Sequence, residues 1–215
     1  MLVALHVHTN HSACSESEIS HIAQYCRKRG IEAIAITDHN QIEGAFELQD
    51  IAPELKVIVS EEISTREGEI IGLFLEERIP AGKDIRETCI EIKNQGGLVY
   101  LPHPFDSLKV HRVRSWNLQK ILDLVDIIEV YNAKASFPLY NRKAREFAEA
   151  HGIRGAVASD SHYVKSIGSA LMSMEPFEGA ADFLEKLSRA QFLMGASSLI
   201  ATWWIRVRKL ARISR

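Results

Sequence analysis

Short segments rich in valine and isoleucine alternate along this chain with longer segments of helical periodicity. Each short segment is typical of a buried β-strand. Seven such strands are predicted, over residues 2–7, 31–37, 56–60, 70–75, 98–101, 127–131 and 153–158. Strand–helix–strand units pack through right-handed crossovers onto a largely parallel sheet. Because the chain has 215 residues, fewer than the ~250 of a typical eight-fold barrel, we predict an α/β fold, a distorted seven-stranded (β/α)7 TIM-like barrel.

Capping residues and glycines mark helix boundaries between these strands. Residues 15–18 (Ser-Glu-Ser-Glu) have the form of a capping box, ahead of a helix that ends at Gly30. A second helix is predicted over residues 84–95. A third begins near Pro138, which a first helical turn tolerates, and ends at Gly152. The strands are therefore expected to connect through helices.

The amino-acid composition favours no particular class of binding partner. The 28 acidic and 26 basic residues nearly balance, so no global field favours nucleic acid or an anionic membrane. The three cysteines, Cys14, Cys26 and Cys89, form no C-x-x-C pair, and their odd number suits reduced thiols. The sequence has neither a signal-peptide pattern nor an apolar run of membrane-spanning length. We therefore predict one cytoplasmic domain over residues 1–198, without stable membrane insertion.

Metal-capable side chains follow five of the predicted strands. They are His6 and His8, Asp38 and His39, Glu61 and Glu62, His103, and Asp160 and His162. Because the carboxyl ends of parallel strands form one face of a barrel, these five clusters are expected to converge in space. Imidazole and carboxylate groups without a cluster of thiolates indicate zinc, manganese or iron.

The spacing within these clusters also indicates metal binding. His6 and His8 are two residues apart, as are Asp160 and His162, so in an extended segment both side chains of a pair project to the same side. A carboxylate such as Glu62 between two cations would hold them close together, acidify a shared water and leave positions open to a phosphate or carbonyl oxygen. Since no G-x-S-x-G motif supplies a serine nucleophile, a metal-dependent hydrolase is predicted.

Six short motifs occur in a fixed order along the chain. They are residues 6–9 (His-Val-His-Thr), 37–40 (Thr-Asp-His-Asn), 62–64 (Glu-Ile-Ser), 103–105 (His-Pro-Phe), 129–132 (Glu-Val-Tyr-Asn) and 159–162 (Ser-Asp-Ser-His). Together they resemble the motifs of the PHP family, named for polymerase and histidinol phosphatase. The resemblance spans residues 1–170. It implies a distorted seven-stranded barrel with two or three divalent metals and, for most members, phosphoesterase activity.

The resemblance implies a role for each matching residue. One metal would be held by four residues, His6, His8, Glu62 and Asp160. Glu62 would bridge to a second metal that His103 also binds, and a third would be held by His39 and His162. The residues expected to act in catalysis are Glu62, His103, Asp160, His162 and Lys134.

Three positions depart from the family pattern. Cys14 stands where members often have His or Asp, so a third metal would be thiolate-bound, weakly bound or absent. Glu69 stands where many members have His; its carboxylate can still bind a metal and favours harder cations such as manganese. Lys134 replaces an arginine that often anchors the phosphate, and a lysine neutralises phosphate as a point charge. Arg142 and Lys143 are weaker candidates for that anchor, and a solvated helix face explains them equally well.

Residues 199–215 form a predicted basic amphipathic helix. Trp203, Trp204, Val207 and Leu210 fall at helical spacing, and the basic residues around them occur without an acid. We expect this helix to pack on the barrel. Contact with nucleic acid, an anionic membrane surface or a partner protein is the alternative.

Three functions are compatible with these features. The first is a phosphoesterase that uses metal-activated water on a phosphomonoester or nucleotide-type phosphate of a small substrate. The second is a 5′–3′ exonuclease acting on short RNA or DNA, in which the basic helix would guide the strand. The third is a non-catalytic PHP module with a binding or regulatory role, which is expected to have lost ligands that this chain retains.

Overall fold

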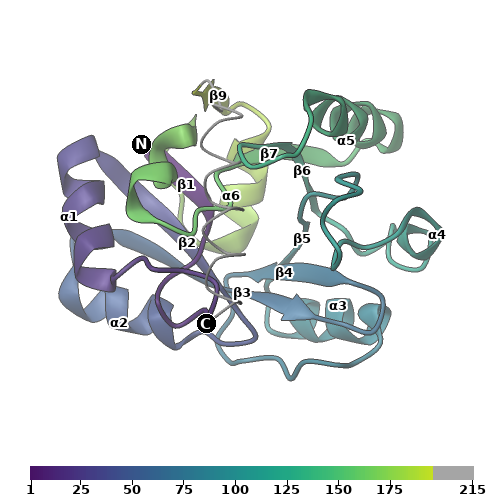
Figure 1. Ribbon diagram of the computed structural model, residues 1–215, viewed down its shortest axis with the longest axis horizontal. Coiled ribbons are helices and arrows are strands. Elements are labelled where there is room, and N and C mark those ends of the chain that lie inside the picture. Colours follow the sequence, from purple (N-terminus) through teal and green to yellow (C-terminus); the bar gives the residue numbers. More distant parts are fainter. Residues whose placement is uncertain (196–215) are drawn as a thin grey trace, which may run out of the picture.

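The computed structural model describes residues 1–195, and in it all seven predicted strands are present (Figure 1). They are β1 (Leu2–Val7), β2 (Ile31–His39), β3 (Lys56–Ser64), β4 (Glu69–Leu73), β5 (Leu98–Leu101), β6 (Ile127–Asn132) and β7 (Arg154–Ala158). Two further strands that the sequence analysis did not predict are β8 (Ala170–Ser173) and β9 (Gln191–Met194). The order in the sheet is β7-β6-β5-β4-β3-β2-β1-β8-β9. The predicted α/β barrel is confirmed, with two strands added to one edge.

Within residues 1–195, the sheet closes on itself only at the carboxyl end of β1. The start of β1 pairs antiparallel with β8, and its last residue, Val7, forms a parallel bridge with Ser161, just beyond β7. The Ser161 amide donates to the His6 carbonyl at 3.0 Å, and the His8 amide donates to the Ser161 carbonyl at 2.9 Å. Because β8 occupies the edge of β1 at its other end, the barrel is distorted. Its closed end lies where the predicted ligands follow β1 and β7.

One barrel strand runs in the opposite direction from its neighbours. β4 pairs antiparallel with both β3 and β5, which departs from the largely parallel sheet predicted from the sequence. Only residues 65–68 connect β3 to β4, which is enough for a hairpin but too short for a crossover helix. Reversal places Glu69, the first residue of β4, opposite Ser64 at the end of β3. Glu69 therefore lies at the carboxyl-end face although it is at the start of its own strand.

Helices cover the outside of the sheet. They are α1 (Ile19–Arg29), α2 (Glu43–Ile51), α3 (Ile85–Asn94), α4 (Ser115–Leu118), α5 (Pro138–His151), the 3-10 helix η1 (Val164–Ser169) and α6 (Gly179–Leu187). Gly30 and Gly152 end α1 and α5 in the left-handed conformation, as predicted. The predicted capping box is wrong, because α1 follows Glu18 without a side-chain cap. No helix among residues 1–195 combines the length and apolar character needed to cross a bilayer. The predicted basic helix over residues 199–215 lies outside the described residues.

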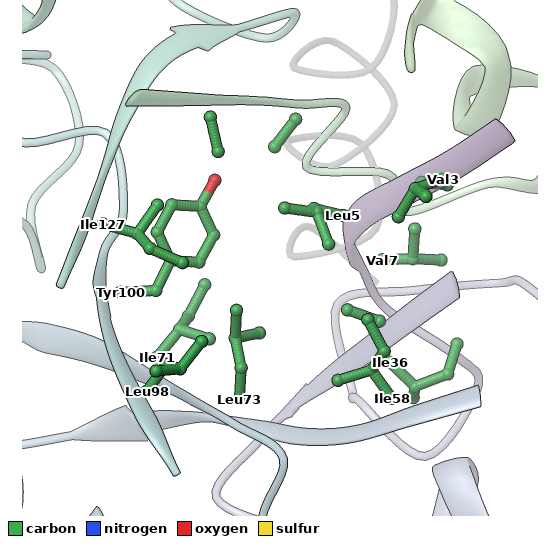
Figure 2. Close-up of a cluster of buried hydrophobic side chains, with 14 of the residues drawn as sticks. Val3, Leu5, Val7, Ile36, Ile58, Ile71, Leu73, Leu98, Tyr100 and Ile127 are labelled. Carbon is green, nitrogen blue, oxygen red and sulfur yellow. The ribbon is translucent and has the colours of Figure 1, made fainter. Parts of the chain in front are cut away.

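Apolar side chains fill the barrel interior. Leu5, Leu73 and Tyr100 come from three different strands and point toward one another (Figure 2), and all three are fully buried. The Tyr100 hydroxyl donates to Oε1 of Glu129 at 3.0 Å. The apolar interior therefore connects directly, through one tyrosine, to the polar groups at the carboxyl end of the barrel.

Candidate metal centre at the carboxyl end of the barrel

All of the predicted metal ligands lie together at one end of the barrel. These residues are His6, His8, His39, Glu62, Glu69, His103, Asp160 and His162. Ligand atoms within 4.8 Å of one another form three groups, His6–Glu62–His103, His6–His8–Asp160 and His8–Cys14–His39–His162. Glu69 belongs to none of these groups and lies beside them, with its Oε1 atom 3.6 Å from Nδ1 of His39. The groups share His6 and His8, so they form one continuous cluster. Convergence of residues far apart in sequence is the arrangement that parallel strands were predicted to produce.

Glu62 lies at the centre of the cluster and is 1% exposed. Its Oε2 atom is 3.3 Å from Nε2 of both His6 and His8, and 3.4 Å from Nδ1 of His39. Its Oε1 atom is 3.3 Å from Nε2 of His103. Burial alone would raise the pKa of Glu62, but His6 and His103 outweigh it and hold that pKa well below its usual range. A charged carboxylate whose two oxygens face different imidazoles is suited to bridge two cations.

His8 tests whether this donor set fits a metal ion. Its Nε2 atom is buried and has no hydrogen-bond partner among the described residues, although buried polar atoms are normally hydrogen-bonded. That nitrogen lies 3.3 Å from Glu62 Oε2 and 3.8 Å from Asp160 Oδ1. Burial and the nearby His162 hold the pKa of His8 well below its usual value, so the ring is neutral. A neutral imidazole nitrogen aimed between two carboxylates fits a divalent cation such as zinc, manganese or iron.

The backbone is strained at three of the expected ligands. Among residues 1–195, five non-glycine residues have positive φ, and three of them are His6 (57°), His103 (31°) and Asp160 (49°). Such conformations cost on the order of 1–3 kcal/mol each and concentrate at functional sites. The predicted extended geometry is therefore wrong at His6 in the first pair and at Asp160 in the second. The imidazoles of His6 and His8 nevertheless reach the cluster, since both belong to the group that contains Asp160.

Glu129 holds two of the expected ligands in place, a role that the sequence analysis did not assign. Its Oε1 atom accepts from Nδ1 of His6 at 2.8 Å, and its Oε2 atom accepts from the backbone amide of His103 at 2.7 Å. The Asn132 amide and the Tyr100 hydroxyl complete its partners at 2.8 and 3.0 Å. A carboxylate behind a ligating imidazole fixes the tautomer and direction of that ring. The sequence feature that could have indicated this role is the position of Glu129 in the Glu-Val-Tyr-Asn motif.

The loop after β1 is tied to β2 by a second buried carboxylate. Asp38 accepts from the Thr9 amide at 2.7 Å and from the hydroxyls of Thr9 and Ser12, both at 2.6 Å. Asp38 therefore positions this loop and contributes to none of the three ligand groups. The Ser15 hydroxyl, expected to cap α1, instead lies 2.9 Å from the His8 carbonyl oxygen. The capping prediction is wrong because the Ser15 hydroxyl donates to the backbone of a predicted metal ligand and not to the helix.

Cys14 lies beside three of the imidazoles. One ligand atom from Cys14 is within 4.8 Å of ligand atoms from His8, His39 and His162. The His8 ring centroid is 4.3 Å from that of His162 and 4.7 Å from that of His39. The other two cysteines are buried in α1 and α3, where burial raises the pKa of each thiol to about 12. Cys14 is thus the cysteine placed to bind a metal, and its set of sulfur and nitrogen donors suits zinc.

Two lysines contact the carboxylate of Asp160. The Lys134 ammonium is 3.4 Å from Asp160 Oδ1 and 2.8 Å from Nδ1 of His162. The Lys109 ammonium contacts Oδ2 of the same carboxylate. Lys134 was predicted to reach the site, whereas Lys109 was missed because it lies in a polar loop whose sequence has no distinguishing pattern. Positive charge is therefore placed beside the metal-capable cluster.

Arg142 and Lys143 do not reach the cluster. Both are exposed on α5. Arg142 forms an ion pair with Glu146 at 3.7 Å, one helical turn along the same surface. These two residues therefore belong to a solvated helix face and do not anchor a phosphate at the cluster.

This fold and this cluster define an α/β barrel protein with a histidine- and carboxylate-rich centre. A family model described as PHP-associated matches residues 138–192, from α5 into β9. The uncharacterized protein MJ0417 of Methanocaldococcus jannaschii is 33% identical over 216 residues, covering 95% of this chain and 87% of the relative. The uncharacterized protein MJ1587 of the same organism is 40% identical over 146 residues, covering 62% and 82%. The chain belongs to the PHP family.

Solved structures share the fold at low sequence identity. A Bacteroides vulgatus two-domain protein, described as containing a predicted PHP-like metal-dependent phosphoesterase, matches with a TM-score of 0.74 at 19% identity, covering 95% of this chain and 69% of that one. A Chromobacterium violaceum amidohydrolase with bound sulfate matches with a TM-score of 0.64 at 15% identity, covering 89% and 97%. At these sequence identities, the similarities show a shared barrel fold and nothing more.

Proposed function

We propose that this chain is a metal-dependent phosphoesterase that hydrolyses a phosphomonoester or a nucleotide-type phosphate. The observation that carries the proposal is the position of Glu62, whose buried carboxylate faces four imidazoles, three through one oxygen and one through the other. Lysine ammonium groups beside the cluster favour a phosphate over a neutral substrate. The ligands whose loss would mark a non-catalytic PHP module are retained.

The proposed ligands divide between two or three cations. His6, His8 and Asp160 would hold one cation and His103 a second, with Glu62 between them. His39 and His162, with Cys14, would hold a third, and Glu69, 3.6 Å from His39, is a further candidate ligand. When bound, zinc, manganese or iron would supply an acidified water as nucleophile and would offset charge on the phosphate oxygens.

The remaining side chains would bind and orient the phosphate. Lys134 would neutralise one phosphate oxygen from its position between Asp160 and His162. Burial, with Lys134 nearby, lowers the pKa of His162 to about 3, so its imidazole stays neutral and can act as a metal ligand. Glu129 would keep His6 directed at the cluster throughout.

Metal analysis together with an ester panel tests this function. Protein reconstituted with manganese, zinc or iron is expected to hold at least two ions per chain and to hydrolyse at least one phosphomonoester. His103→Ala should lower kcat/KM by roughly a hundred-fold or more, because it removes an imidazole from the bridging carboxylate. His151→Ala, on the exposed end of α5, is the matched control and should change neither quantity. Less than one ion per chain, with no ester hydrolysed, would refute the proposal.

Cobalt spectroscopy tests the part assigned to Cys14. Protein reconstituted with Co²⁺ is expected to show a sulfur-to-cobalt charge-transfer band in the near ultraviolet, because the thiol lies among three imidazoles. Cys14→Ser should remove the band and lower the cobalt content by about one ion per chain. Cys26→Ser, at a cysteine buried in α1, should keep the band. A band that survives Cys14→Ser would show that this thiol is not a ligand.

A further inference from the structure

A pocket of about 180 Å³ adjoins the metal-capable cluster. It lies between the β3–β4 hairpin, which contributes Arg66 and Glu69, and the loop after β5, which contributes Arg112 and Arg114. Glu69 is the wall shared with the cluster, because its Oε1 atom lies 3.6 Å from Nδ1 of His39. A substrate at the cluster could therefore extend directly into this pocket.

The two walls of the pocket are joined by their backbones. The Glu69 amide donates to the His111 carbonyl at 2.7 Å. Gly68 has a φ of 138°, and a Cβ atom at that position would lie 2.6 Å from the backbone nitrogen of Val113. Such an approach is open to glycine alone. The loop is thus held against the hairpin, and the residues that it carries have a defined position over the pocket.

The described residues do not neutralise the positive charge in the pocket. Within residues 1–195, the guanidinium groups of Arg66, Arg112 and Arg114 form no ion pair with a carboxylate. Arg66 donates to the Gly82 carbonyl at 3.1 Å, Arg112 donates to a backbone carbonyl at 3.4 Å, and Arg114 stacks over Trp116 at 5.4 Å. Each guanidinium has five N–H donors, so most of its donors stay available to a ligand.

The acidic residues that line the same pocket are engaged elsewhere. Glu67 accepts from the Ile85 amide at 3.0 Å and pairs with Lys120 at 3.1 Å. Glu69 faces His39 and the metal-capable cluster. The pocket therefore presents three unneutralised guanidinium groups, which are the side chains best matched to phosphate oxygens.

We propose that this guanidinium pocket, formed by Arg66, Arg112 and Arg114, binds a second phosphate group of the substrate. The proposal rests on the proposed function, in which the phosphate to be cleaved lies at the metal-capable cluster. Val110, which lines the pocket, and Trp116, in the adjoining helix α4, are 78% and 69% exposed, so apolar surface beside the guanidinium groups is available to the rest of the substrate. The second phosphate comes either from a small bisphosphorylated molecule or from the next phosphodiester of a short nucleic acid strand.

Paired substrates test the proposal and distinguish these two sources. Fructose 1,6-bisphosphate is compared with fructose 6-phosphate, and a 5′-phosphorylated dinucleotide with the matching mononucleotide. We expect kcat/KM to favour the two-phosphate member of at least one pair by about ten-fold or more. The replacements Arg66→Gln and Arg112→Gln together should reduce that ratio by about ten-fold. Arg142→Gln removes the same charge from the exposed face of α5 and should leave the ratio unchanged.

The preferred pair identifies the source. Preference within the sugar pair assigns the pocket to small bisphosphates, and preference within the nucleotide pair assigns it to the next phosphate of a strand. Equal kcat/KM within both pairs, or a preference that survives the double replacement, would overturn the proposal while the hydrolysis of monophosphates stands.

Binding of inorganic phosphate separates this proposal from the proposed function. Equilibrium dialysis of metal-reconstituted protein should find one phosphate more per chain in the wild type than in the double arginine variant. If no ester is hydrolysed at all, the proposed function is refuted. The dialysis still shows whether the guanidinium pocket binds phosphate. Equal phosphate binding by the two proteins would overturn the proposal that this pocket binds a phosphate group.

Discussion

Glu62→Gln is expected to lower kcat/KM by about three orders of magnitude, equivalent to roughly 4 kcal/mol of transition-state stabilisation. The glutamine amide has nearly the same shape but carries no charge, so four imidazoles would lose the anion they surround. Metal content should fall in parallel, because neither amide atom replaces a bridging carboxylate oxygen. Elemental analysis and steady-state kinetics with the best ester of the panel measure both effects.

Glu61→Gln is the matched control, one residue away on the opposite face of β3. The Glu61 carboxylate accepts from the Ile79 amide at 2.8 Å, away from the cluster, and burial raises its pKa to about 7. A glutamine oxygen can keep that hydrogen bond. Metal content and kcat/KM should therefore remain near those of the wild type. Comparable losses in the two variants would show that damage to β3, and not loss of a bridging ligand, explains the Glu62 result.

Glu129→Gln is expected to weaken metal binding by about ten- to a hundred-fold, although Glu129 belongs to none of the three ligand groups. The charged carboxylate accepts from both His6 and the His103 backbone. A glutamine keeps one acceptor oxygen and turns its NH2 group toward the other donor. His6 would then lose its fixed direction. Competition with a chelator measures metal affinity, and activity should recover in part at saturating metal.

The carboxylate of Glu149 provides the comparison for that result. It is exposed on α5, so Glu149→Gln removes the same charge without touching the site. Metal affinity should be unchanged. If Glu129→Gln also bound metal with wild-type affinity, the positioning role assigned to Glu129 would be wrong.

Much of the architecture was predictable because its causes are local. Strand segments are apolar runs of the right length, and helix ends are marked by Gly30 and Gly152, which adopt the left-handed conformation that favours glycine. Once the strands were assigned, the convergence of His6, His103 and Asp160 followed, because parallel strands present their carboxyl ends on one face.

Contacts between segments that have no periodic relation were not predictable. Lys109 reaches Asp160 across 51 residues, from a loop whose sequence resembles ordinary polar surface. Glu129 was visible in its motif, but its role depends on where the His6 ring and the His103 backbone lie. The guanidinium pocket exists only because the hairpin and the loop after β5 meet at Gly68.

By itself, the sequence determined the class of fold, the set of metal-capable side chains and the face of the barrel on which they gather. Those properties follow from residue type and from periodicities of two and 3.6 residues. Only the tertiary structure decided that β4 is reversed, which brings Glu69 to the site, that His6 is left-handed, and that Cys14 lies among three imidazoles. The physical reason is that chain reversal, backbone strain and ligand grouping depend on packing between distant segments, which no local pattern encodes.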